Sequence, residues 1–221
     1  MICKKLFPSL LTAFLILLPA VSVFAVQSGN IEYNAAVKLF DYTKLDKTPV
    51  INDADMYFDM ALNLSDTKEK ERFINLALGK YFLASKIAPE DRRTYVQMAR
   101  LYDEMQKDTL AKSYFFHALN LGSNDPYTNF WFAEFYFKRR DFKRALTYYN
   151  KAYNSGYTDN YKLNLHLAEI YEKFADLSNA LKFYRTTYSI NPQDTKLQEK
   201  IQDIGSLNYE SSEYYNNTIR E

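Results

Sequence analysis

The chain has 221 residues, with 28 basic and 27 acidic side chains and a formal net charge of +1 at pH 7. A nucleic-acid-binding domain is usually strongly basic, so this balance argues against a general nucleic-acid binder. There is one cysteine, which excludes an intramolecular disulfide, so stability must come from packing.

Residues 1–25 are predicted to be a signal peptide. Lys4 and Lys5 precede an almost wholly apolar run at 6–18, and Ala25 ends a Val-Phe-Ala sequence that suits cleavage ahead of Val26. The run has about 13 residues, and a membrane span needs roughly 20. We therefore expect an exported protein, periplasmic or secreted, with an uncleaved membrane anchor as the alternative. Cleavage removes two of the basic residues, which leaves 26 basic against 27 acidic side chains.

Residues 26–64 are predicted to form atypical N-terminal helices. Within 30–45, Ala36 is followed four residues later by Phe40 and seven residues later by Thr43. This spacing recurs four times further along the chain, where it indicates the second helix of a helix pair.

A first helix is predicted over residues 54–64, with Tyr57 and Ala61 as its buried positions. Aligning it with the later repeats requires extra residues around 65–68, so this unit is irregular. Terminal repeats are often atypical because one of their faces meets water.

Four alanines recur at intervals of 34, 34 and 35 residues: Ala77, Ala111, Ala145 and Ala180. Each is followed four residues later by an aromatic side chain: Tyr81, Phe115, Tyr149 and Tyr184. Three residues further on comes a small side chain: Ala84, Ala118, Ala152 and Thr187. Self-similarity at this period indicates a stack of helix pairs.

The clearest unit, residues 129–153, contains two helical stripes. The first carries Phe132, Ala133, Tyr136 and Phe137, and the second carries Phe142, Ala145, Leu146, Tyr149, Ala152 and Tyr153. Alanine is expected where the two helices cross closely, because a larger side chain would push the backbones apart. The first helices repeat too: Ala99, Ala133 and Ala168 are each followed three residues later by a tyrosine, Tyr102, Tyr136 and Tyr171.

With these columns in register, the chain resembles the tetratricopeptide repeat (TPR) family. Residues 92–125, 126–160 and 161–194 match the family's helix–turn–helix unit, and 66–89 match its second half. The resemblance implies an all-α fold, a TPR-type right-handed superhelix, which is an α-solenoid of antiparallel helix pairs over residues 65–194. One departure is systematic: the glycine between paired helices is replaced by Gln106, Arg140 and Ala175.

Residues 195–205 are predicted to form a C-terminal capping helix. Asp194 can cap its start, Leu197, Ile201 and Ile204 line one side, and Gly205 is expected to stop it. Residues 206–221, rich in Asn, Ser, Tyr and Glu, are expected to be a flexible tail.

The resemblance implies that first helices line a concave groove that binds a protein or peptide. The predicted groove residues are Arg93, Arg100, Tyr127, Phe130, Trp131, Glu134, Phe137, Lys138, Leu165 and Glu169. Aromatic side chains such as Trp131 give large contact area with few torsions to freeze. The alternative is that Phe130 and Trp131 pack against the neighbouring repeats. The Lys and Asn cluster with which some family members bind chaperone C-termini is absent, which excludes that partner.

Residues 138–144 place five cations in seven positions at the turn between paired helices. This basic turn could dock on an anionic surface, or it could be a well-solvated turn. For catalysis the sequence offers little: its two histidines have no metal-ligand spacing, and its five glycines form no phosphate loop. We expect no enzyme and no cofactor.

The sequence therefore predicts an exported protein- or peptide-binding scaffold or adaptor acting through the TPR groove, in a cell-envelope or secretion assembly. One alternative is a structural component of the envelope that self-assembles. A further alternative is a peripheral binder of anionic envelope surfaces through the 138–144 turn. The expected partner is a protein or peptide, with no nucleic acid, and with membrane contact only through the signal segment or weak peripheral association.

Overall fold

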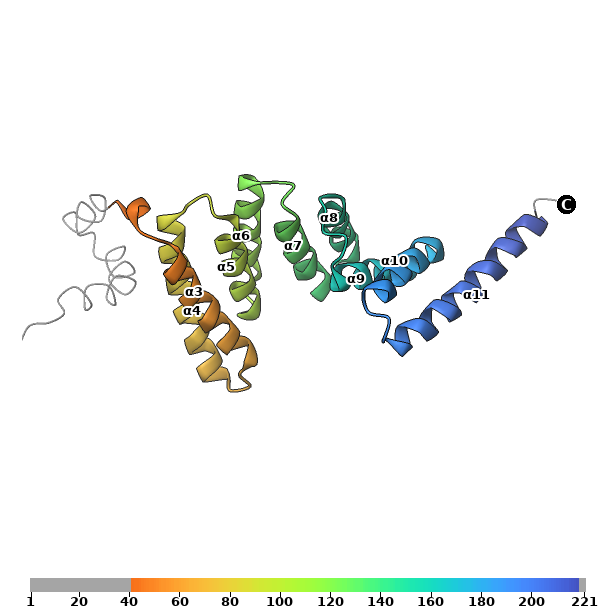
Figure 1. The fold of residues 1–221 in the computed structure, drawn as a ribbon, viewed down its shortest axis with the longest axis horizontal. Helices are drawn as coiled ribbons and strands as arrows, with labels where there is room; N and C mark the ends of the chain where they lie inside the picture. Colours follow the sequence, from red (N-terminus) through yellow and green to blue (C-terminus); the bar gives the residue numbers. More distant parts are fainter. Residues whose placement is uncertain (1–40, 219–221) are drawn as a thin grey trace, which may run out of the picture. The chain divides into compact units, whose positions relative to one another are not determined.

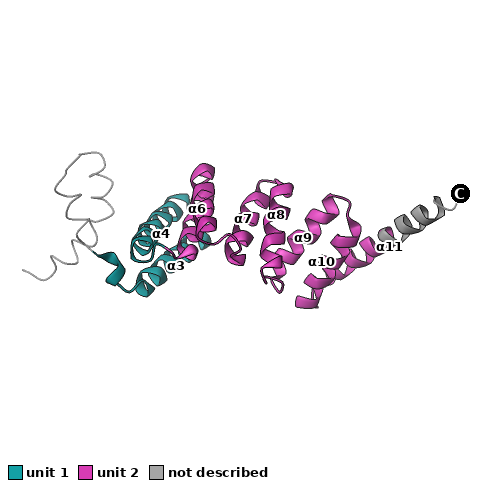
Figure 2. Cartoon of the chain, turned by 90° about the horizontal axis from the view of Figure 1, so that it is seen from above, with its two compact units in different colours: residues 1–89 teal, residues 90–221 magenta. Residues whose placement is uncertain are grey.

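The computed structural model describes residues 41–218, with side chains up to residue 207. Over this range the fold is all-α: nine α-helices, one 3-10 turn and no strand. The chain divides into two compact units, residues 1–89 and 90–221 (Figure 2). The predicted signal peptide and most of the segment 30–45 lie outside the described residues.

The described part of the first unit is a helical hairpin preceded by the 3-10 turn η1 (Tyr42–Lys44). Helix α3 (Thr48–Asn63) packs on α4 (Thr67–Ile87), and η1 contacts α4. The helix predicted from residue 54 begins six residues earlier. Residues 41–45 are not α-helical, because Asp41 is extended and caps η1. The predicted helix over 30–45 is therefore wrong in its last five residues.

The second unit is a row of helix pairs closed by a single helix (Figure 1). Its helices are α5 (Arg92–Glu104), α6 (Asp108–Leu121), α7 (Pro126–Lys138), α8 (Phe142–Asn154), α9 (Tyr161–Lys173), α10 (Leu177–Ile190) and α11 (Thr195–Thr218). Each odd-numbered helix from α5 to α9 pairs with the next, and α11 packs on α10. Successive pairs touch through α6 and α7, α5 and α7, and α8 and α9. This is the predicted α-solenoid of helix pairs.

The small and aromatic columns form the helix crossings, as predicted. The four alanines Ala77, Ala111, Ala145 and Ala180 are fully buried, and so are the first-helix alanines Ala99, Ala133 and Ala168. The four aromatic residues that follow the second-helix alanines, Tyr81, Phe115, Tyr149 and Tyr184, are buried as well. A methyl group therefore sets the helix separation, and a ring fills the space beside it.

The turns inside the three pairs of the second unit share one geometry. After α7, the amide of Asp141 donates to the carbonyl of Tyr136, and the amide of Arg140 donates to that of Phe137. This is a Schellman motif, in which the residue after the helix is left-handed. Arg140 has φ 58°, and the equivalent Gln106 and Ala175 have φ 57° and 59°. The positions at which the family has glycine are therefore left-handed here, where a side chain destabilises the backbone most.

The repeating tyrosines of the first helices meet a second aromatic column, Tyr114, Tyr148 and Phe183, whose spacing was not used in the prediction. Tyr102 stacks on Tyr114, Tyr136 on Tyr148, and Tyr171 on Phe183, with ring centroids 5.2, 5.8 and 5.6 Å apart and interplanar angles of 9°, 5° and 3°. Such a pair adds about 0.5–1.5 kcal/mol beyond its buried area. The repeat therefore places many of the chain's rings inside the pairs.

The last helix covers the end of the solenoid but does not stop where predicted. Leu197 and Ile204 are buried and Ile201 is half-buried, as expected for a cap on α10. Gly205 is helical, and α11 continues to Thr218. A glycine stops a helix when it adopts the left-handed conformation, and Gly205 has no positive φ. The predicted helix end at Gly205 is therefore wrong.

Candidate binding face on the first helices of the second unit

The first-helix face is the side of α5, α7 and α9 that carries the ten predicted groove residues. Trp131 of α7 is the point where these three helices meet. The Arg100 guanidinium of α5 lies over the Trp131 ring, 3.5 Å from its centroid, and the Lys162 amine of α9 lies 6.0 Å from it. Cations over a Trp face are held by the ring's quadrupole, by about 0.5–2 kcal/mol each.

A hydrogen-bonded network fixes the α5 side of this ring. Arg100 Nη1 donates to Gln97 Oε1 at 2.6 Å, and the Tyr127 hydroxyl donates to the same oxygen at 3.3 Å. Burial raises the pKa of Tyr127, although Arg100 and Arg93 oppose the rise. The Trp131 indole N–H is buried and has no acceptor within the described chain. Trp131 itself is half-buried, so part of its ring stays accessible.

Phe130 is a core residue and is not open on this face. Its side chain is 4% exposed, and its ring contacts Trp131, Tyr149 and Tyr157. Tyr157 comes from the loop that follows α8, outside the periodic positions. Phe130 is therefore buried within its own unit, 126–160, and these ring contacts are not with the neighbouring repeats, whereas Trp131 lies at the border between core and surface.

The Glu134 carboxylate is engaged in contacts within the protein. Its Oε1 accepts the Tyr149 hydroxyl of α8 and lies 2.8 Å from His166 Nδ1 of α9. Its Oε2 lies 2.5 Å from Lys162 Nζ, and its side chain is 12% exposed. Phe137 stacks on the His166 ring at 3.9 Å. One carboxylate thus ties three helices together.

The protonation states of this cluster follow from its surroundings. Burial alone would raise the pKa of Glu134, but His166, Lys162 and Tyr149 outweigh it and hold that pKa below its ordinary value. Burial raises the pKa of Tyr149, and the nearby Glu134 charge raises it further. Glu134 is therefore an ionised acceptor and Tyr149 a neutral donor at neutral pH.

The next junction repeats the arrangement. The Tyr184 hydroxyl of α10 donates to Glu172 Oε2 of α9 at 2.7 Å, and Lys200 Nζ of α11 lies 2.5 Å from Glu172 Oε1. Tyr184 and Tyr149 occupy the same repeat position. The first pair has Phe115 there, which lacks the hydroxyl. A tyrosine at this repeat position is the sequence signal that could have predicted the hydrogen bond to a glutamate of the paired helix.

The basic turn is largely paired within the second unit. Lys138 Nζ lies 3.3 Å from Asp103 and 3.4 Å from Glu104. Arg139 bridges Asp103 and Asp108. Arg144 pairs with Asp141 at 2.6 Å, so three of the five cations of residues 138–144 have an acidic partner.

The remaining predicted residues lie toward the edges of the face. Leu165 and Glu169 on α9 are half-buried, and Arg93 at the start of α5 is exposed. The accessible centre is therefore Tyr127 and Trp131, flanked by Arg100 and Lys162.

Two buried asparagines at the starts of α7 and α9 were also missed. Asn129 Nδ2 donates to the carbonyls of Ser123 and Asp125, and Asn164 Nδ2 donates to the equivalent carbonyls of Thr158 and Asn160. Their 35-residue spacing is the signal that could have identified them. Each one anchors the loop before its first helix, which fixes where the binding face begins.

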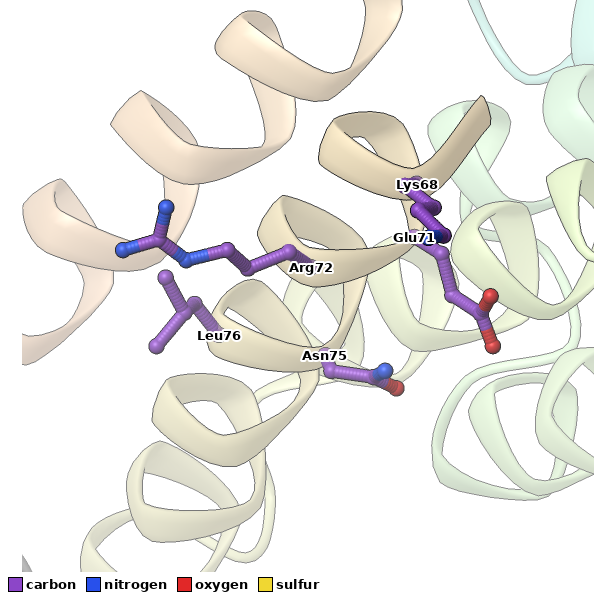
Figure 3. Close-up of a pocket in the computed structure, with 5 residues that line it drawn as sticks. All are labelled: Lys68, Glu71, Arg72, Asn75 and Leu76. Atoms are coloured by element: carbon purple, nitrogen blue, oxygen red, sulfur yellow. The ribbon is translucent and has the colours of Figure 1, made fainter. Parts of the chain in front are cut away.

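Outside this face, a shallow depression lies on α4 of the first unit (Figure 3). Its lining residues are Lys68, Glu71, Arg72, Asn75 and Leu76. All five come from one helix, so no group from a second element converges there. Among the described residues, no three His, Cys, Asp or Glu side chains gather as metal ligands. No helix in this range combines the length and apolar character needed to cross a membrane.

Comparison with known proteins agrees with this architecture. Residues 161–194 match the family model described as tetratricopeptide repeat. Among solved structures, PilF of Pseudomonas aeruginosa is similar at 14% identity and a TM-score of 0.56, over 76% of this chain and 72% of that chain. The MamA protein is similar at 16% identity and a TM-score of 0.52, over 76% and 91% of the two chains.

YrrB, described as a TPR protein with an unusual peptide-binding site, is similar at 18% identity and a TM-score of 0.52, over 75% and 84% of the two chains. No curated protein sequence matches this chain. Identities this low support the fold alone. The matched repeat at residues 161–194 and the stacked helix pairs show an all-α fold of the TPR-solenoid type.

Proposed function

We propose that this protein is an exported scaffold or adaptor that binds a segment of a protein partner on the first-helix face of its second unit. The carrying observation is the arrangement around Trp131, where α5, α7 and α9 hold one accessible indole between two cations. Trp, Tyr and Arg dominate binding hot spots because they bury large, specific surfaces. Their geometry is already fixed, so little ordering entropy opposes binding. The peptide-binding site named for YrrB supports the same kind of ligand.

Export is part of the proposal and rests on residues 1–25 alone. Their charged start, apolar run and small-residue cleavage sequence favour a signal peptide. The partner is then a component of the envelope or of a secretion assembly. Catalysis is not part of the proposed function.

The two other candidate functions have less support. For end-to-end self-assembly, α11 would need an apolar outer side, but Gln198 and Gln202 expose a polar one, as terminal capping repeats do. For binding to anionic surfaces, the 138–144 turn would need available cations, and three of its five are paired with acids. Binding on the first-helix face is therefore favoured.

The test is site-specific photo-cross-linking in the native envelope or secreted fraction. A photoreactive side chain replaces Tyr127 on the face or, as the matched control, Thr147, which is exposed on α8. We expect a partner cross-linked from position 127 and absent from position 147. The partner is then purified, and its affinity is measured for the parent chain and for Trp131→Ala.

Trp131→Ala should weaken binding by at least about tenfold, with a circular dichroism melt showing that the helices remain folded. Equal affinity would place binding elsewhere and overturn the proposal. Cross-linking only to a second copy of this chain would favour the self-assembling alternative instead.

A further inference from the structure

One side of α3 in the first unit is open, although its counterpart on α7 is covered. On α7, the residues that directly follow Phe132 and Phe135 lie at the crossing with α8. Both rings contact Phe115 of the preceding pair, Phe132 by stacking and Phe135 edge-on, and both are buried. Phe58 and Ala61 lie at the crossing of α3 with α4. The residues one position before them, Tyr57 and Met60, therefore correspond to Phe132 and Phe135 of α7.

The open side of α3 consists of Met56, Tyr57 and Met60. Tyr57 is half-buried by its contact with Phe73 of α4, with ring centroids 6.1 Å apart. Met56 and Met60, one helical turn apart, are 44% and 42% exposed, whereas Phe135 is 2% exposed. Apolar side chains aligned on one side of a helix are the signature of a face that packs against another element.

The chain itself has a segment of suitable length in the sequence directly before η1. Seven residues, 41–47, separate Phe40 from the start of α3, and six separate the end of α8 from the start of α9. The turn η1 in this connection contacts α4, so the chain enters at this hairpin. In the sequence, Tyr33, Val37 and Phe40 are spaced i, i+4 and i+7, which gives an apolar helical stripe.

We propose that the open side of α3 is the docking site for residues 30–40 of this same chain. The apolar stripe of that segment covers Met56 and Met60, as α6 covers Phe132 and Phe135 of α7. The α3–α4 hairpin of the first unit then gains a preceding second-helix element from its own chain. This inference is independent of the proposed function of the first-helix face.

The test measures the reactivity of an introduced thiol in the full chain carrying Cys3→Ser. Met60→Cys reports on the docking site. Leu62→Cys is the matched control, because Leu62 is 43% exposed and lies on another side of α3. We expect Met60→Cys to react with a water-soluble maleimide at least about tenfold more slowly than Leu62→Cys, since buried thiols are inert.

A second variant removes the occupant. Adding Val37→Glu and Phe40→Glu to Met60→Cys should raise its labelling rate to that of the Leu62→Cys control, with unchanged helicity. Equal rates for the two cysteines in the unaltered segment would overturn the proposal, because the side would then be open. Protection that survives the two glutamates would also overturn it. In that case a dependence of protection on protein concentration would identify a second copy as the occupant.

Discussion

Replacing the three left-handed turn residues by glycine should stabilise the second unit. Gln106, Arg140 and Ala175 have φ between 57° and 59°, where a Cβ approaches the following carbonyl at a cost of about 1–2 kcal/mol. Glycine removes this strain. Because glycine is more flexible in the unfolded chain, the gain in the free energy of unfolding is reduced by about 0.5–1 kcal/mol. Each substitution should therefore add about 0.5–1 kcal/mol to the free energy of unfolding.

The three turns are 34 and 35 residues apart in sequence and belong to three different helix pairs, so the effects should add. The triple glycine variant should gain about 1.5–3 kcal/mol. A unit of 100–150 residues shifts its melting temperature by about 3–5 °C per kcal/mol, which predicts a rise of about 5–15 °C for the second unit. Circular dichroism melts and urea denaturation both measure this change.

Two control variants separate the backbone effect from side-chain loss. Arg140→Ala keeps the strain and should leave stability nearly unchanged. Lys143→Gly introduces glycine in the first turn of α8, where the backbone is helical, and should lower stability by up to about 1 kcal/mol. If Arg140→Gly and Ala175→Gly leave the melting temperature unchanged or lower it, the left-handed geometry of these turns is wrong.

Three other substitutions test the packing, a cap and the buried charge cluster. Ala145→Leu should cost about 1–3 kcal/mol by overpacking the α7–α8 crossing, and an unchanged melting temperature would refute that placement. Lys107→Asp should gain about 0.5–2 kcal/mol, because Lys107 gives α6 no side-chain cap, whereas Asp141 at the same position caps α8; a urea midpoint at or below that of the parent would contradict it. The folded-state pKa of Glu134 lies below its ordinary value of 4.5, so its charge stabilises the fold above that pH, and this contribution is lost as the pH falls through the folded pKa. Glu134→Gln should therefore be less stable than the parent at pH 7 and lose less stability on acidification, as measured by urea titrations from pH 7 to pH 3; parallel pH profiles would show that Glu134 is not coupled to folding.

The periodic part of the fold could be predicted because the same contact recurs in every repeat, so its residues form a regular pattern in the sequence. Alanine at a fixed interval with an aromatic residue four positions later has one physical reading, a close helix crossing with a ring beside it. All four copies of that pair are buried. The turn positions were also visible in the sequence, since the replaced glycines marked where the backbone becomes left-handed.

The binding face could be predicted less well, because periodicity gives the side of a helix on which a residue lies but not its depth. Phe130 lies on the predicted side, yet the loop residue Tyr157 covers it. Loop positions have no period from which such a contact follows. The end of α11 escaped prediction for a related reason. Gly205 stops a helix only if the chain after it turns, and that depends on the contacts of the following residues rather than on the glycine.

The charges of the second unit hold its helix pairs together more than they face a partner. Asp103 and Asp108 pair with Arg139, Glu134 with Lys162, and Glu172 with Lys200; in each case the acid lies in one pair and the base in the next helix pair or in α11. Where one partner is exposed, as Asp108, Lys162 and Lys200 are, the ion pair contributes little stability, about 0–1 kcal/mol, and its effect is to join one helix pair to the next. The recognition capacity that remains lies in the accessible rings Tyr127 and Trp131. Under the proposed function, specificity for a partner on this face therefore has to come from the shape and apolar area around one indole, rather than from the charge balance that the sequence displays.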